Sequence, residues 1–119
     1  MQTIFQYVKG NVGRTPNLKK TTFVGFVNPY TNEIIIGYAQ WNLYEDYNPE
    51  MGKDVAYARA ARWAEKEKSL DDIKFPPSWF YNGYAGLEFE TLVKFIKRCQ
   101  AYFKQATLVG WARELLSRV

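Results

Sequence analysis

The sequence contains no histidine and only one cysteine, Cys99. Without histidine the usual zinc and iron ligand sets cannot be assembled, and one cysteine can form neither an internal disulfide nor a cysteine metal site. Histidine is also the commonest general base, so this chain cannot build a Ser-His or Cys-His nucleophile pair. We therefore expect no transition-metal site, no cofactor, and a protein that is not an enzyme.

Long apolar runs are missing as well. No stretch approaches the roughly 18 apolar residues that a membrane-spanning helix needs, and the opening MQTIFQYVKG lacks the charged-then-apolar pattern of a signal peptide. These two features predict a cytoplasmic protein without a membrane segment.

Carboxylates could still support acid–base chemistry. The candidates are adjacent or closely spaced acids in polar segments, namely Asp71 with Asp72, Glu45 with Asp46, and Glu65 with Glu67. Acids in such segments are usually solvated surface charges, which is the simpler interpretation.

Cationic and aromatic residues are present in excess. The 119 residues are 47% hydrophobic, which suits one compact domain over 1–119. The net charge of +4 favours an anionic partner, and aromatic residues make up 18% of the chain. Aromatic side chains with polar tips are typical of interfaces and ligand pockets, so stacking surfaces are expected.

The N-terminal third has the pattern of strands. TIFQYV is rich in aromatic and β-branched residues, and KTTFVGFV and EIIIGYAQW flank the turn-forming NPYTN, which predicts an antiparallel hairpin. Gly25 and Gly37 fall nearly opposite each other in this hairpin. A twist, a bulge or a ring from a helix over the gap is the simple explanation, and close approach of a ligand is the alternative.

The rest of the chain predicts helices. Asn48, Pro49 and Glu50 are typical of an N-cap and a first helical turn, with a helix from there to about residue 68. A second helix is expected over about 87–104, and a further helical stretch over 107–118 with a kink at Gly110. The fold class is therefore α+β, an N-terminal antiparallel sheet of three or four strands followed by two or three helices.

Apolar residues cover more than one face of these C-terminal helices, and one small sheet would not cover them all. This surplus predicts a homo-oligomer, a dimer or a higher assembly up to a hexamer. The expected contact residues are Leu92, Phe95, Tyr102 and Trp111.

Arg59 has no carboxylate at the neighbouring positions of its predicted helix, while Arg62 and Lys66 place further cations on the same face. A phosphate would relieve their repulsion, because a guanidinium can bind two of its oxygens at once. The alternative is a tertiary ion pair, for which the candidates are Asp46, Glu88 and Glu90. For Arg98 and Arg113 the same two alternatives are open, a phosphate of a ligand or a carboxylate of the protein.

The connector between the predicted helices carries the run Ser78-Trp79-Phe80-Tyr81-Asn82. Its rings could stack on a base, and the Asn82 amide could pair with a base edge. Core packing with a turn asparagine is the alternative. No glycine-rich phosphate loop is present, since GNVGRT lacks the required lysine and strand-to-helix context.

The order FVGFVN…IIIGYAQWN…DYNPEMGKDVAYARA, over residues 22–62, resembles small phage proteins, among them the type-one Thoeris anti-defence sponges. The resemblance implies an N-terminal antiparallel sheet, two C-terminal helices and an oligomer. It also implies capture of cyclic ADP-ribose isomers made by bacterial immune enzymes, with cyclic oligonucleotides as further ligands.

Carried over to this sequence, the resemblance implies that Arg59 faces a phosphate, that an aromatic residue between Trp79 and Tyr81 lies under the base, and that Asn82 is a polar contact. Arg113 would serve a second anionic pocket between subunits. The connector with Pro76-Pro77 departs from the family pattern.

Two functions are therefore open. The first is a sponge that sequesters a cyclic nucleotide signal in the cytoplasm of a phage-infected bacterium. The second is a small phage protein that binds nucleic acid or a host factor through the same basic and aromatic surface.

Overall fold

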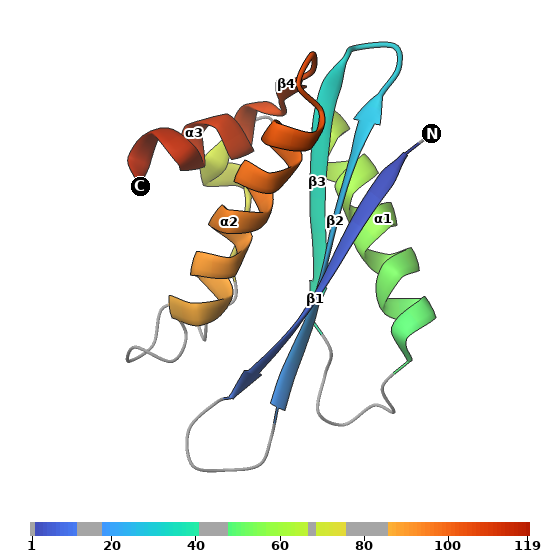
Figure 1. Ribbon diagram of the computed structural model, residues 1–119, viewed down its shortest axis with the longest axis vertical. Coiled ribbons are helices and arrows are strands. Elements are labelled where there is room, and N and C mark those ends of the chain that lie inside the picture. Colours follow the sequence, from blue (N-terminus) through green and yellow to red (C-terminus); the bar gives the residue numbers. More distant parts are fainter. Residues whose placement is uncertain (1, 12–17, 41–47, 67–68, 76–85) are drawn as a thin grey trace.

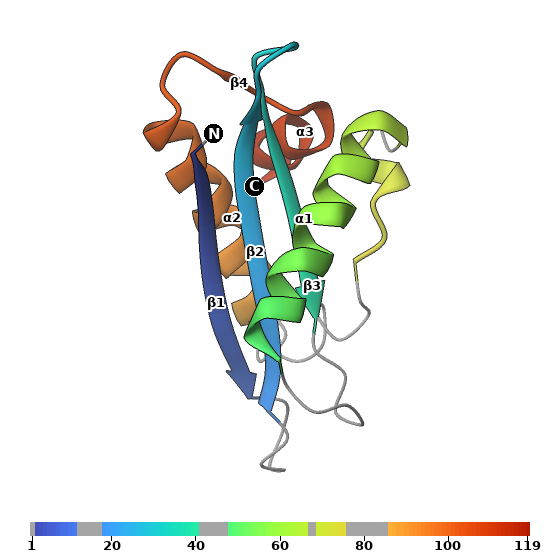
Figure 2. The same ribbon diagram turned by 90° about the vertical axis from the view of Figure 1, so that its right-hand side faces the viewer.

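A computed structural model describes residues 2–11, 18–40, 48–66, 69–75 and 86–119 of the chain. They form a four-stranded sheet with helices on both faces (Figures 1 and 2). The elements in chain order are β1 (Thr3–Asn11), β2 (Leu18–Asn28), β3 (Glu33–Gln40), α1 (Pro49–Lys66), the short 3-10 helix η1 (Leu70–Asp72), α2 (Gly86–Tyr102), β4 (Thr107–Leu108) and α3 (Gly110–Arg118). This arrangement confirms the predicted α+β class.

The hairpin between β2 and β3 forms as the sequence predicts. The two strands pair antiparallel, with Asn28 opposite Glu33 at the turn. The Asn28 side chain accepts a hydrogen bond from the backbone N–H of Tyr30 at 2.9 Å, and the N–H of Asn32 donates to the carbonyl of Asn28 at 2.8 Å. Asn32 has a φ of 56°, the left-handed conformation that asparagine tolerates better than most residues.

The sequence predicts three or four antiparallel strands, but neither the place of the fourth strand nor its parallel pairing was predicted. Thr107 and Leu108 pair in parallel with Glu33 and Ile34, so the sheet is mixed, and its last strand comes from between α2 and α3. The prediction of one kinked helix over 107–118 is wrong at its start, because the N–H of Thr107 donates to the carbonyl of Asn32 at 3.1 Å instead of joining a helix. Gly110 is the first residue of α3 and not a kink within it.

The start of α1 matches its prediction closely. The Asn48 side chain accepts hydrogen bonds from the N–H groups of Glu50 at 3.0 Å and Met51 at 3.3 Å, which satisfies two of the otherwise unpaired donors of the first turn. Pro49 is the first helical residue, where a missing N–H has no cost. The helix ends at Lys66, and α2 ends at Tyr102.

Two cores lie on the two faces of the sheet. The larger one joins β-strand residues such as Phe23 and Ile36 to α2 and α3, and the smaller one joins Val24, Ile35 and neighbouring residues to α1. Because successive side chains of a strand point to opposite faces, β2 and β3 are buried almost continuously along their middle.

Gly25 and Gly37 let these helices approach. A Cβ on Gly25 would lie 2.5 Å from the Cys99 sulfur of α2, and one on Gly37 would lie 2.5 Å from both the Ala56 carbonyl oxygen and the Ala60 Cβ of α1. The glycines face opposite sides of the sheet, and each gap is filled by a helix of the same chain. The two glycines are therefore explained by helix packing, and not by a ligand that approaches the strand backbone.

This packing gives a stability prediction for Gly25. The Gly25→Ala change should destabilise the protein by about 1–3 kcal/mol, since the new methyl group meets Cys99. The double variant Gly25→Ala with Cys99→Ala should recover most of that loss, because the next neighbours, Ile36 and Phe95, lie at 3.4 and 3.5 Å. Urea denaturation of both single variants and the double variant measures the coupling. Purely additive losses would show that the sulfur is not the obstruction.

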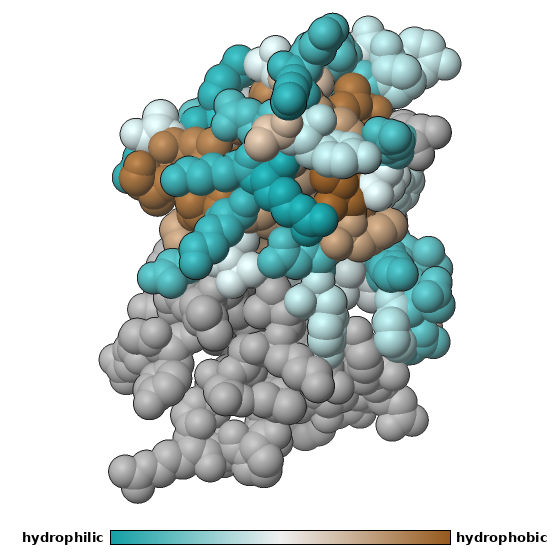
Figure 3. Space-filling view, viewed as in Figure 1, coloured by the Kyte–Doolittle hydropathy of each residue, from teal (hydrophilic) through white to brown (hydrophobic). Residues whose placement is uncertain are grey.

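The residues expected at an oligomer interface are mostly core residues of the chain itself. Leu92, Phe95 and Trp111 are fully buried, and only Tyr102 is exposed, at 54%. Their selection as contact residues is wrong for these three, because the sheet together with α3 covers the apolar faces of α2. On the face of the molecule that Figure 3 shows, hydrophilic side chains separate the apolar areas from one another. A homo-oligomer remains a prediction that no longer rests on that surplus.

The described helices include none that is both long enough and apolar enough to cross a membrane.

Candidate functional site

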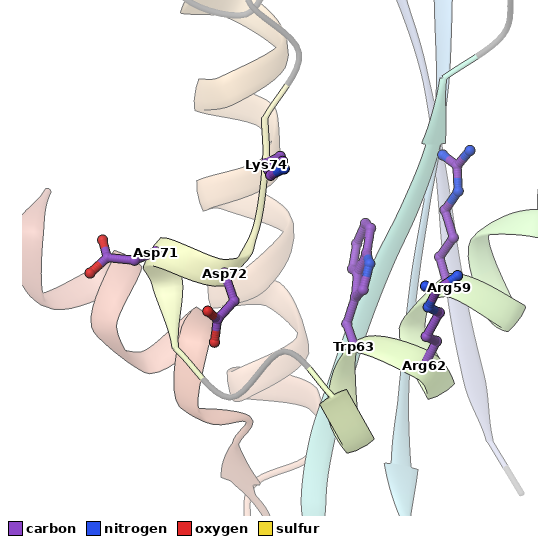
Figure 4. Close-up of a pocket in the computed structure, with 6 residues that line it drawn as sticks. All are labelled: Arg59, Arg62, Trp63, Asp71, Asp72 and Lys74. Atoms are coloured by element: carbon purple, nitrogen blue, oxygen red, sulfur yellow. The ribbon is translucent and has the colours of Figure 1, made fainter.

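A cavity of about 520 Å³ lies between the C-terminal half of α1 and the segment that follows it. Its lining residues come from α1, from η1 and from the extended residues after η1 (Figure 4). They are Arg59, Arg62, Trp63, Asp71, Asp72 and Lys74. We call this cavity the α1 groove.

The helix presents its three groove residues beside the stripe that packs on the sheet. Ala56 and Ala60 are fully buried against Gly37 of β3, and Arg59, Arg62 and Trp63 follow at spacings of three and four residues along the adjoining side. Both arginines are exposed, and Trp63 is partly buried. The small alanines thus hold the helix close to the sheet while the long side chains reach the groove.

Arg59 donates one long hydrogen bond to the rest of the described chain. Its Nη1 donates to the backbone carbonyl of Tyr38 at 3.5 Å, the upper limit of a hydrogen bond. Among the residues that the structure describes, no carboxylate lies within 4.0 Å of the guanidinium of Arg59 or Arg62. Glu90 is thereby excluded as the ion-pair partner of Arg59, whereas Asp46 and the side chain of Glu88 lie outside the described part.

The acidic residues of the groove have other partners. One carboxylate oxygen of Asp72 accepts hydrogen bonds from the N–H and the hydroxyl of Ser69, both at 3.1 Å, which forms a capping box for η1. Asp71 lies 3.9 Å from Arg118 of α3. Both aspartates are exposed, as the interpretation of surface charge expected, but they also form one wall of the groove.

Tyr38 of β3 connects the sheet to the groove wall that carries Lys74. Its hydroxyl donates to the backbone carbonyl of Lys74 at 3.3 Å, and its side chain is buried. Burial raises the pKa of the Tyr38 phenol far above its usual value, and the nearby positive charge of Arg59 acts in the opposite direction. The phenol therefore stays protonated at any physiological pH and keeps the Lys74 segment attached to β3.

The structure brings together two of the eight predicted site residues, Arg59 and Arg62. Arg98 belongs to α2, and α2 lies on the opposite face of the sheet from α1 (Figure 2). The Nη1 of Arg98 donates to the Gln6 side chain at 3.4 Å. Arg113 is exposed on α3 and does not line the groove. The four connector residues, Trp79, Phe80, Tyr81 and Asn82, lie outside the described residues.

Trp63, Asp71, Asp72 and Lys74 were not predicted as groove residues. Trp63 could have been found, because it lies four residues after Arg59 and so shares its side of the helix. No local pattern places the other three there, since their position depends on how η1 packs against α3.

The described residues contain no cluster of three or more potential metal ligands of the His, Cys, Asp or Glu type. Comparison of the chain with protein-family models, with curated proteins and with solved structures found no match.

Proposed function

We propose that this protein binds a cyclic nucleotide in the α1 groove and sequesters it without cleaving it. The ligand class is a cyclic ADP-ribose isomer or a cyclic oligonucleotide, as the resemblance of residues 22–62 implies. The observation that carries the proposal is the guanidinium of Arg59, which lines the groove and has no carboxylate within 4.0 Å among the described residues.

The composition of the groove supports a phosphate-bearing ligand. Arg59, Arg62 and Lys74 supply three cations, while Asp71 and Asp72 are engaged with Arg118 and Ser69. A guanidinium can bind two phosphate oxygens at once, and such charge-assisted contacts are among the stronger hydrogen bonds in proteins. A volume of about 520 Å³ lies within the range of typical small-molecule sites.

Sequestration fits this chemistry better than turnover. A nucleophile needs a positioned base to be activated, and a chain without histidine lacks the commonest one. In the proposed setting, the protein acts in the cytoplasm of a phage-infected bacterium, as a homo-oligomer, and lowers the free concentration of an immune signal.

The direct test is recovery of the ligand. Protein incubated with cyclic ADP-ribose and then denatured should release a compound of unchanged mass, as measured by mass spectrometry. Native mass spectrometry of the complex before denaturation reports the number of subunits and the bound mass together. A hydrolysed product, or no retained ligand at micromolar protein, would overturn the proposal.

Binding to a nucleic-acid polymer is the second candidate, and one surface favours it. Phe5, Tyr7 and Tyr57 are exposed on the α1 side of the sheet, and the Lys53 ammonium lies 5.3 Å from the centre of the Phe5 ring. Aromatic and cationic side chains of this kind bind single strands without sequence preference.

Salt dependence separates the two candidates. A groove that contacts one or two phosphates should lose little affinity between about 50 and 200 mM salt, whereas a polymer that contacts 6–10 phosphates loses about 10³–10⁵ over that range. Titrations of cyclic ADP-ribose and of a single-stranded oligonucleotide at both salt concentrations make the comparison. A steep salt dependence for the oligonucleotide, with no binding of cyclic ADP-ribose, would favour the second candidate.

A further inference from the structure

Trp63 occupies a central position in the α1 groove. In Figure 4 its indole stands between the two arginines of α1 and the opposite wall that carries Asp72 and Lys74. The residue is partly buried and packs against the larger core, so the ring is held by the fold while it also lines the cavity.

Two buried aromatic residues fix the orientation of this indole. The ring centre of Tyr38 lies 4.9 Å away at an interplanar angle of 58°, and that of Trp111 lies 6.2 Å away at 89°. Tyr38 is 3% exposed and Trp111 is fully buried. Both contacts are tilted or edge-on, so neither of these neighbours stacks face to face on the indole.

From this geometry we propose that Trp63 is the surface on which a planar base of the ligand stacks, so that the groove selects nucleotides over sugar phosphates. The inference rests on the proposed function, and it adds a second point of recognition next to the cations. Arg59 lies one helical turn before Trp63, and Arg62 directly precedes it. A phosphate held by the arginines and a base on the indole would therefore belong to one compact ligand.

The preference expected from such stacking can be stated as an affinity ratio. Stacking of a base on an aromatic side chain corresponds to roughly a five- to hundredfold gain in affinity. Because Trp63 is already oriented by Tyr38 and Trp111, little side-chain freedom is lost when a base binds. Tryptophan also offers the largest ring face among the natural side chains.

The experiment compares two probes that share a ribose 5-phosphate group, adenosine 5′-monophosphate, which carries a base, and ribose 5-phosphate, which carries none. Calorimetric titration of the whole protein should show tighter binding of adenosine monophosphate by about five- to a hundredfold. Trp63→Leu should remove most of that preference, because it lowers the affinity for adenosine monophosphate far more than the affinity for ribose 5-phosphate. Trp63→Phe should keep part of the preference, since a smaller ring still stacks.

The outcomes distinguish this inference from the proposed function. Equal binding of the two probes by the unaltered protein overturns the role of Trp63 and leaves phosphate capture standing. Binding of neither probe, nor of cyclic ADP-ribose, overturns the proposed function as well. An equal loss for both probes in Trp63→Leu assigns Trp63 a purely structural role, which contradicts the inference. If Trp63→Leu does not fold, Trp63→Phe decides, and an unchanged preference in that variant overturns the assignment.

Discussion

Replacing Gly37 with alanine should cost about 3 kcal/mol of folding free energy, the upper part of the usual range for added core volume. The new Cβ would lie 2.5 Å from the Ala56 carbonyl oxygen and 2.7 Å from the Ala60 Cα. Both are backbone atoms of α1, so no change of rotamer relieves the contact and the whole helix must move away from β3. Urea denaturation followed by circular dichroism measures the loss as a lower midpoint.

The matched control is Gly25, which packs against α2 on the other face of the sheet. The two glycines differ in whether a second substitution can remove the contact. Ala60→Gly combined with Gly37→Ala removes only the Ala60 methyl group and leaves two backbone contacts, so it should restore little stability. Cys99→Ala combined with Gly25→Ala removes the whole obstruction and should restore most of it. If Gly37→Ala unfolds at the midpoint of the unaltered protein, α1 does not pack on β3 as closely as the structure shows.

The Arg59→Ala variant should bind cyclic ADP-ribose about ten- to over a hundredfold more weakly than the unaltered protein. A charge-assisted hydrogen bond contributes about 1.5–3 kcal/mol, which sets that range. The fold should survive the change, because Arg59 is exposed and the one hydrogen bond that its side chain donates to the described residues, to the Tyr38 carbonyl, measures 3.5 Å. Arg59→Lys should restore only part of the affinity, since lysine lacks the planar fork.

Arg98→Ala is the control for this experiment. It removes the same charge from the opposite face of the sheet, where Arg98 contacts Gln6 and not the groove. Binding should therefore stay within about twofold of the unaltered protein, the change expected when a distant surface charge alone is lost. Equal losses in Arg59→Ala and Arg98→Ala would show that overall charge, and not the groove, governs binding. An unfolded Arg59→Ala variant whose residual folded fraction binds normally would make Arg59 a structural residue.

Much of the fold could be predicted from local signals in the sequence. Asn28 and Asn32 mark the hairpin because their side chains and backbone tolerate the turn, and Asn48-Pro49 marks the start of α1 because each suits its helical position. These signals act over a few residues, so they can be recognised in the sequence without knowledge of the tertiary structure. The two-residue strand β4 carries no such signal, since its pairing partners, Glu33 and Ile34, lie far from it in the sequence.

The groove could be predicted only on its helical wall. Arg59 and Arg62 could be predicted because a spacing of three residues places both on one side of a helix. The same argument from charge also selected Arg98 and Arg113, which lie elsewhere in the fold. Spacing along one helix says which residues share a side, but not which side meets another element. The opposite wall depends on tertiary contacts, such as the hydrogen bond from the N–H of Leu70 to Glu114 at 3.4 Å, that no local pattern records.

The parallel pairing of β3 with β4 affects how this protein folds during its synthesis. Asn32, at the hairpin turn, donates from its side chain to the carbonyl of Gln105, 73 residues later, and the N–H of Val109 donates to Ile34. The hairpin can form early, but the edge of β3 at Glu33 and Ile34 stays unpaired until residues 107–109 have been translated. Until then the nascent chain presents an open strand edge, the kind of surface on which unfinished chains aggregate or are held by chaperones.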